Sequence, residues 1–182
     1  IDHAAFWTAG FQKTNESRLG LLRVGFEMTD LKSRQTSVNG RNGLRFYTHG
    51  LVRQGHTNDG QLLGNWTGPG SDAQFLEVDL FRETTRFGVF VERIRRDEET
   101  FEESISFDYA FRGHDCEVVG GTRASYARGD WLIDGSASVT HRKNRSFIGL
   151  DGVNFDFLRE NNFALELTLS WWPRSLREWQ TF

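Results

Sequence analysis

The stretch that decides the fold runs Phe163-Ala164-Leu165-Glu166-Leu167-Thr168-Leu169-Ser170-Trp171. Large apolar residues occupy every second position, and small, polar or charged residues occupy the positions between them. Successive side chains of a β-strand point to opposite faces, so this period of two predicts a strand with one apolar face and one polar face. No part of the chain sustains the period of about 3.6 residues that an amphipathic helix requires.

The same alternation recurs along the chain and predicts an all-β fold. Clear candidates for further strands are 19–28, 74–82, 103–111 and 131–141, and weaker candidates are 44–53, 86–95, 117–127 and 148–157. Ala4–Phe11 is a candidate tenth strand. Short segments at 82–86, 113–116, 128–130 and 143–145 predict tight turns. We therefore expect an antiparallel, up-and-down arrangement of about nine or ten strands.

Composition narrows the class of protein. The length of 182 residues suits one domain, and no boundary divides residues 1–182. A helical membrane protein is excluded because no run approaches the roughly 18 consecutive apolar residues of a spanning helix. The aromatic content of 14% and the net charge of only −3 exclude disorder. Basic residues are spread among acidic ones, which argues against a nucleic-acid partner, and the single Cys116 offers no disulfide or metal cluster.

Two kinds of fold satisfy strands with one apolar face. In a soluble sandwich or small barrel the apolar faces pack inward, whereas in an outer-membrane barrel they face lipid and the polar faces line a wet lumen. Alternation alone does not separate these alternatives. The candidate strands run about nine to twelve residues, which matches a tilted membrane crossing. Aromatic residues near strand ends, among them Tyr126, Phe111, Trp131, Trp171 and Trp172, favour the transmembrane β-barrel.

An outer-membrane barrel usually ends with a strand that descends to the periplasm. Counting backwards from 163–171 on that basis places 157–163, 128–130, 96–102 and 54–73 outside the cell. A bacterial barrel of one chain normally has an even number of strands, so nine strands favour an incomplete barrel.

The segment between residues 47 and 72 resembles a known family. It contains Tyr47-Thr48-His49-Gly50, then Gly55-His56-Thr57-Asn58-Asp59-Gly60-Gln61-Leu62-Leu63-Gly64, and then Gly68-Pro69-Gly70-Ser71-Asp72. These elements, followed by alternating strands, are similar to the capsule-assembly outer-membrane lectin family (Wzi-like). Thr67 stands where an apolar residue is common in that family, and Pro173 interrupts the last strand before the aromatic terminus.

The resemblance implies a closed barrel of roughly eighteen strands, within the even-numbered range of bacterial barrels, in the outer membrane. It implies binding of exported capsular or other exopolysaccharide, attachment of that polymer at the cell surface, and no enzymatic activity. The chain would then be the C-terminal portion of the barrel. Its partners would be outer-membrane lipid, the missing N-terminal portion and the polysaccharide export machinery, and no cofactor is expected.

The exterior segment 54–73 carries the side chains that a sugar polymer requires. Amide and carboxylate groups bind hydroxyls, and flat aromatic rings stack on sugar faces. Turn chemistry alone also demands Gly, Asn and Asp, so each residue has a purely structural alternative. The candidate ligand-binding residues are His56, Asn58, Asp59, Gln61, Asn65, Trp66 and Asp72.

Charged residues within the strands suggest a second group of contacts. Glu77, Asp79, Arg123 and Asp134 fall on the polar faces, where alternating signs favour mutual neutralisation over a selectivity filter. The dense run of charges from Arg93 to Glu103 favours a solvated hairpin tip with weak ion pairs.

Other functions remain as alternatives. The chain has no H-E-x-x-H or G-x-S-x-G motif, so catalysis and a metal site are not predicted. A porin-like channel and a soluble β-barrel or sandwich that binds a small ligand are the alternatives to polysaccharide binding.

Overall fold

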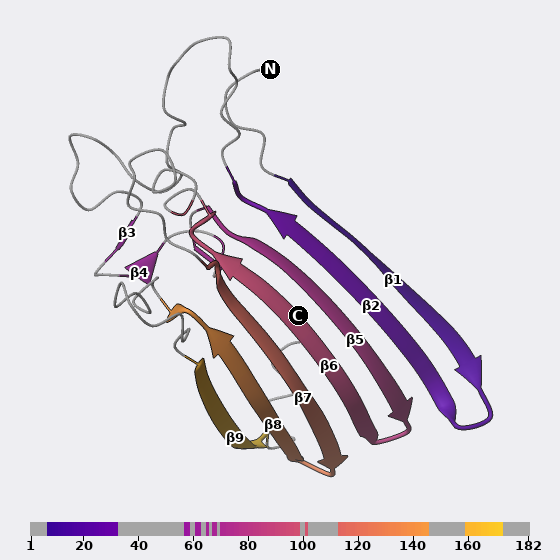
Figure 1. Cartoon of the computed structure of the whole chain (residues 1–182). Helices are drawn as coiled ribbons and strands as arrows, with labels where there is room; N and C mark the ends of the chain where they lie inside the picture. The colour runs from indigo at the N-terminus through magenta and orange to yellow at the C-terminus, as the bar shows by residue number, and fades with distance from the viewer. Residues whose placement is uncertain are drawn as a thin grey trace.

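The computed structural model of the chain describes residues 7–32, 57–58, 61–62, 65, 67–68, 70–98, 101, 113–145 and 159–172. Seven strands form one sheet in the order β1-β2-β5-β6-β7-β8-β9, and every neighbouring pair is antiparallel (Figure 1). The strands are β1 (Trp7–Ser17), β2 (Gly20–Asp30), β5 (Asp72–Arg82), β6 (Thr85–Arg96), β7 (Asp115–Arg128), β8 (Trp131–Lys143) and β9 (Arg159–Trp171). A separate two-stranded ladder joins β3 (Thr57–Asn58) and β4 (Gln61–Leu62). The predicted all-β, up-and-down arrangement is confirmed for this sheet.

Strand order alters the predicted position of one turn. The predicted strands 44–53, 103–111 and 148–157 lie outside the described residues. In the sheet, β2 pairs directly with β5, β6 with β7, and β8 with β9. Because no strand stands between these partners in the sheet, the strand directions alternate along it. The 128–130 turn therefore lies at the same end of the sheet as the turns after β1 and β5. The prediction that 128–130 shares an end with 54–73 and 96–102 is therefore wrong.

The two ends of the sheet differ in the length of their connections. Two-residue turns at 18–19, 83–84 and 129–130 join β1 to β2, β5 to β6 and β7 to β8, and we call this the turn end. Gly129 has a φ of 61°, the left-handed conformation that such a tight hairpin turn requires. The connections 31–71, 97–114 and 144–158 lie at the opposite end, which we call the loop end.

The register places large apolar residues of all seven strands on one face. Cross-strand partners share a face, and Val24 pairs with Val78, which pairs with Val89. We call this the apolar face and the opposite one the polar face. The apolar face is exposed: Leu165 and Leu167 are 75% and 76% accessible. Lys13 of β1, opposite Val24, is a charged exception on the edge strand.

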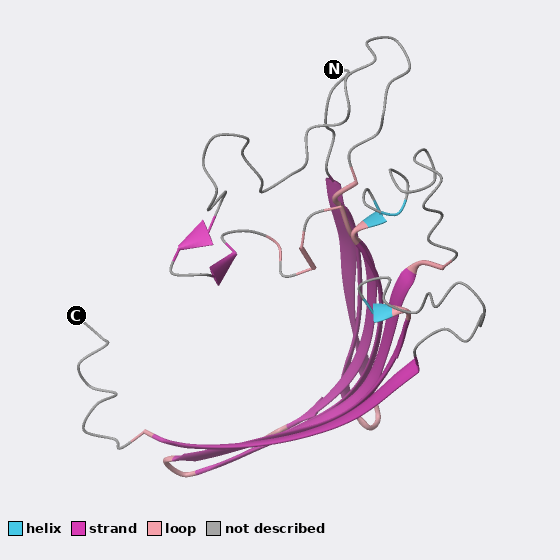
Figure 2. Ribbon diagram, turned by 60° about the vertical axis from the view of Figure 1, so that its left-hand side comes forward, coloured by secondary structure: helices cyan, strands magenta, loops and turns pink. Residues whose placement is uncertain are grey.

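The polar face is the more covered of the two. Along β7, exposed residues from Val118 to Tyr126 on the apolar face alternate with half-buried residues on the polar face. Figure 2 shows the sheet as a strongly curved wall. Side chains on the inside of a curve converge, so we identify the covered polar face as the concave one.

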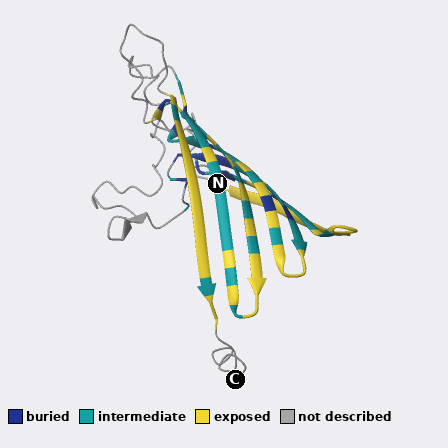
Figure 3. Cartoon of the chain, turned by 90° about the horizontal axis from the view of Figure 1, so that it is seen from below, coloured by how far each residue is buried: buried dark blue, intermediate teal, exposed yellow. Residues whose placement is uncertain are grey.

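Buried residues are few and are concentrated in two places (Figure 3). One is the loop end, where Leu31, Ala73 and Ile94 are the buried hydrophobic residues of the described chain. The other is on the polar face, where Asp79 of β5 and the neighbouring Gly25 and Gly88 are buried. In the described part of the chain, no helix is long and apolar enough to cross a membrane.

The types of residue on the apolar face differ between the turn end and the loop end. At the turn end the rings of Trp131 and Trp171 lie 6.2 Å apart, in register with each other, and Tyr126 is paired with Ile133 beside them. At the loop end the same face carries Arg93, Arg95, Lys143 and Arg159 in place of apolar residues. The apolar rows therefore form a band with aromatic residues beside Arg82 and Arg128 at the turn-end border and with cations at the loop-end border.

Candidate functional site

The polar face carries a cluster of five charged side chains from four adjacent strands. We call it the arginine–carboxylate cluster; its members are Arg23 of β2, Glu77 and Asp79 of β5, Arg86 of β6 and Arg123 of β7. The register brings them together, because Arg23 is opposite Asp79, which is opposite Gly88, which is opposite Arg123. Four strands contribute to one site only because their polar residues are aligned across the sheet.

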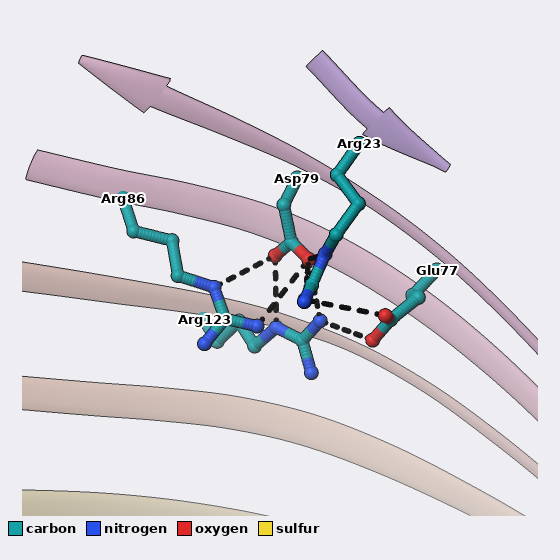
Figure 4. Close-up of polar contacts among 5 residues, drawn as sticks. All are labelled: Arg23, Glu77, Asp79, Arg86 and Arg123. Atoms are coloured by element: carbon teal, nitrogen blue, oxygen red, sulfur yellow. Dashed lines mark hydrogen bonds and ion pairs between the residues drawn. The ribbon is translucent and has the colours of Figure 1, made fainter. Parts of the chain in front are cut away.

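Asp79 is the centre of the cluster and is completely buried. Arg123 donates to it through Nε at 3.0 Å and Nη2 at 2.8 Å, and Arg86 Nε donates at 3.0 Å (Figure 4). Arg23 donates through Nε at 3.1 Å and also through Nη2. Hydrogen bonds between charged groups are roughly twice as strong as neutral ones, so the three guanidinium groups hold this carboxylate firmly.

Glu77 joins two of the same arginines. Arg123 Nη2 contacts one of its carboxylate oxygens, and Arg23 Nη2 lies 3.2 Å from the other. The guanidinium groups of Arg23 and Arg86 also lie 5.3 and 5.5 Å from the ring centroid of Phe81, within the range of cation–π attraction. The predicted mutual neutralisation of Glu77, Asp79 and Arg123 is confirmed, while Asp134 belongs to a different part of the face.

Two glycines make room for the carboxylates. A Cβ atom added at Gly88 would overlap Asp79 Oδ1, and one added at Gly25 would lie 2.9 Å from Glu77 Oε1. The side chains of β5 therefore extend over the bare backbone of both neighbouring strands. Glycine within a strand often marks such a close approach, and here it permits the cluster to form.

A polar hollow lies beside the cluster on the same face. Its walls include Arg86, Arg123, Asp134, Ser136, Glu166 and Thr168, from strands β6 to β9. Among the described residues, neither Asp134 nor Glu166 has a hydrogen-bond or ion-pair partner, so both are available to water or a solute. The saturated cluster is suited to holding the wall in shape, while the hollow offers hydroxyl and carboxylate groups.

A second network of charged side chains lies at the loop end. On the apolar face, Asp72 accepts hydrogen bonds from Lys32 Nζ at 2.9 Å, Arg93 Nη1 at 3.1 Å and Gln74 Nε2 at 3.1 Å. Asp72 was predicted as a ligand residue of an exterior segment. It is instead the first residue of β5, buried, and occupied by these partners.

The charges that follow β6 are also ordered. Glu98 is buried, with Arg95 Nη1 at 3.2 Å and His114 Nδ1 at 2.8 Å. Arg142 of β8 makes a bidentate contact with Asp115 at 2.8 and 2.6 Å. The prediction of a solvated hairpin tip with weak ion pairs is therefore wrong for Glu98, because its side chain is buried between Arg95 and His114.

Three other predicted ligand residues, Asn58, Gln61 and Asn65, are among the described residues. Asn65 Oδ1 accepts hydrogen bonds from the backbone and hydroxyl of Thr67 at 3.1 and 3.0 Å, which is a local turn contact. Asn58 and Gln61 are register partners in the β3–β4 ladder. The structure thus makes Asn58 and Gln61 partners in one ladder, while Asp72 belongs to the seven-stranded sheet. The remaining predicted residues, His56, Asp59 and Trp66, lie outside the described residues.

Sequence reasoning missed Arg23 and Arg86 as members of the cluster. Both fall on polar positions of predicted strands, but their partners are 56 and 7 residues away, and only the register shows the contact. The glycines at 25 and 88, each inside a predicted strand, were the signal in the sequence that a bulky side chain crosses there.

The chain matches no family model, no curated protein and no solved structure.

Proposed function

We propose that the chain forms part of the wall of a bacterial outer-membrane β-barrel, and that this barrel binds exported polysaccharide at its exterior end. The observation that carries the first half is the separation of the two faces. Large apolar residues of six strands are exposed on one face, where those of β2 are half-buried, while the opposite face gathers charges into ion pairs. Such a sheet suits hydrocarbon on one side and water on the other.

The borders of the apolar band support the same proposal. Aromatic residues at the turn end, such as Trp131 and Trp171, suit one membrane interface. Between the rows of Phe163 and Trp171 the strand rises over eight residues, roughly 27 Å at about 3.4 Å per residue. Strands tilted by about 35–45° then give an apolar band roughly 19–22 Å tall, of the same order as the height of about 25 Å that outer-membrane barrels show.

The two ends of the sheet support an orientation. Outer-membrane barrels have short periplasmic turns and longer extracellular loops. We therefore place the turn end in the periplasm and the loop end outside the cell. This orientation puts the 31–71 segment, with all the predicted ligand residues except Asp72 of β5, at the exterior.

Polysaccharide binding rests on the residues of that exterior segment and on their resemblance to the capsule-assembly lectin family. The Asn58–Gln61 pair in the β3–β4 ladder places two amide-bearing residues side by side. Amides can bridge neighbouring hydroxyls of a sugar. Capsular or other exopolysaccharide is the proposed ligand, and the export machinery, outer-membrane lipid and the rest of the barrel are the proposed partners.

The full-length protein tests both halves. We expect it to need detergent for extraction, to run as a compact species in SDS until heated, and to retain acidic polysaccharide in a pull-down. The double substitution Asn58→Ala and Gln61→Ala should reduce retention, whereas Arg18→Ala at the turn end should leave it unchanged. A protein that stays monomeric in water without detergent would contradict the membrane assignment.

A porin-like channel is the second candidate, and the polar hollow favours it. Asp134, Ser136, Glu166 and Thr168 present polar groups to the concave side, as a water-filled lumen requires. Conductance in planar bilayers separates the two functions. A steady ion current without polysaccharide retention would favour the channel.

A further inference from the structure

Two cations lie directly opposite each other on the apolar face at the loop end. Lys143 ends β8, Arg159 begins β9, and the two are register partners. They lie four residues beyond Val139 and Phe163, which are also partners, or roughly 13 Å along the strands. His141 and Asn161 form the row between, joined by a hydrogen bond of 2.7 Å.

This pair lacks the compensation that other cations of the loop end receive. Arg93 contacts Asp72, Arg95 contacts Glu98, Arg96 contacts Glu117, and Arg142 contacts Asp115. Within the described ranges, no acidic side chain lies at ion-pair distance from Lys143 or Arg159. Like charges directly opposite on a sheet are destabilising, so an anion from outside the described sheet would stabilise the pair.

The position of the pair identifies the kind of anion. Both side chains are on the face that carries Val139, Phe163 and Leu165, one polar row beyond the apolar rows. If that face meets hydrocarbon, the pair lies at the level of lipid headgroups. A phosphate there would find a guanidinium for a bidentate contact and an ammonium beside it, while its acyl chains would lie over Val139 and Phe163.

We propose that Lys143 and Arg159 form a binding site for a phosphate group of an anionic glycolipid in the outer leaflet. This inference rests on the proposed membrane function and adds a specific lipid site to it. The polar side chains of His141 and Asn161 lie between the phosphate and the acyl chains, where a glycolipid carries its sugar hydroxyls.

The chain offers a control cation at the other end of the same face. Arg128 lies on the same face in β7, opposite Trp131, but at the turn end. It is exposed like the cations of the pair, and its removal changes the net charge on the same face. The double variant Lys143→Gln and Arg159→Gln is therefore compared with Arg128→Gln in the full-length protein.

The experiment measures binding of purified lipopolysaccharide to the protein in nanodiscs of phosphatidylcholine. We expect the double variant to bind at least about tenfold more weakly, since two charge-assisted contacts are lost, and Arg128→Gln to bind like the wild type. Removal of the lipid phosphates by phosphatase should weaken binding to the wild type but not to the double variant.

The outcomes separate this inference from the function on which it rests. Equal binding by wild type and double variant, in protein that inserts into bilayers and is heat-modifiable in SDS, overturns the lipid site alone. Failure of the wild type to insert into any bilayer overturns the membrane function. Retention of lipid-free acidic polysaccharide that is lost in the double variant also overturns the lipid site, because the anion would then be the polymer.

Discussion

Strands β5 and β9 both carry apolar residues on the apolar face. On the polar face, the carboxylates of β5 are paired with arginines, whereas Glu166 of β9 has no such partner among the described residues. On the apolar face, β5 carries Leu76, Val78 and Leu80, and β9 carries Leu165, Leu167 and Leu169. On the polar face, β5 carries Glu77 and Asp79, which are held by three arginines. There β9 carries Glu166, Thr168 and Ser170, for which no such partners lie among the described residues.

The difference shows that separate constraints act on the two faces. The apolar face is similar in the two strands because it depends only on the alternation within each strand. The polar face depends on neighbours: β5 lies between β2 and β6, and β9 is paired only with β8 in the described sheet. Substitutions on β5 and β9 should therefore differ strongly on the polar face and little on the apolar face.

Removal of the central carboxylate should have the largest effect. Asp79→Ala leaves three guanidinium groups without the buried anion that they share, and loss of one partner from a buried ion pair destabilises by about 3–5 kcal/mol. The corresponding change on β9, Glu166→Ala, should stay within about 0.5 kcal/mol because the side chain is exposed. Urea-dependent unfolding of the full-length protein in lipid vesicles measures both. Equal losses for the two variants would contradict the contrast between the strands.

A cation placed on the apolar face should be the next most harmful change. Leu167→Lys puts a charge in the middle of the row of β9, and at a membrane midplane this destabilises a barrel by about 2–4 kcal/mol. Its neighbour Thr168→Lys puts the same charge into the polar hollow and should change stability by less than about 1 kcal/mol. Vesicle unfolding of this adjacent pair reports which face meets lipid, and a reversed order would place lipid on the polar face.

The strands of the sheet could be predicted from the sequence because the alternation of apolar and polar residues lies within each strand. The predicted 74–82 and 131–141 correspond to β5 and β8, and even the weak candidate 117–127 corresponds to β7. Strand β1 was foreseen only as Ala4–Phe11, because Gln12, Lys13 and Thr14 interrupt the alternation, and its pairing with β2 extends it to Ser17.

The cluster and the role of Asp72 could not be predicted in the same way. The alternation within one strand indicates which face a residue occupies. It does not indicate which residue of another strand lies opposite. Arg23 and Asp79 meet only because β2 pairs directly with β5, across a connection of about 40 residues whose predicted strand 44–53 would have separated them. Asp72 was assigned to a loop because glycines precede it, whereas Lys32 and Arg93 hold it at the start of a strand.

Filling the space that Gly88 leaves beside β5 should have an intermediate effect on the free energy of unfolding. Gly88→Ala drives a methyl group into Asp79 Oδ1, and overpacking of this kind destabilises by about 1–3 kcal/mol. Gly120→Ala is the matched control, since a Cβ there meets nothing within 4 Å. It should be neutral or stabilise by up to about 1 kcal/mol, because alanine restricts the unfolded chain. If both variants unfold at the same urea concentration, the close approach at Gly88 is not needed for stability.

Loss of the exposed ion pair between Arg145 and Glu160 of β9 should have the smallest effect on the free energy of unfolding. Their atoms lie 3.4 Å apart, and the side chains are 57% and 40% exposed. A double-mutant cycle with alanine should give a coupling of about 0.2–1 kcal/mol that disappears in about 1 M salt, where the Debye length is about 3 Å. The cycle for Arg142 and Asp115, which is bidentate and largely buried, should give a larger coupling that persists in salt. Similar salt sensitivity in both cycles would mean that water reaches Asp115 as freely as Glu160, and that charges on β7 and β9 are not distinguished by burial.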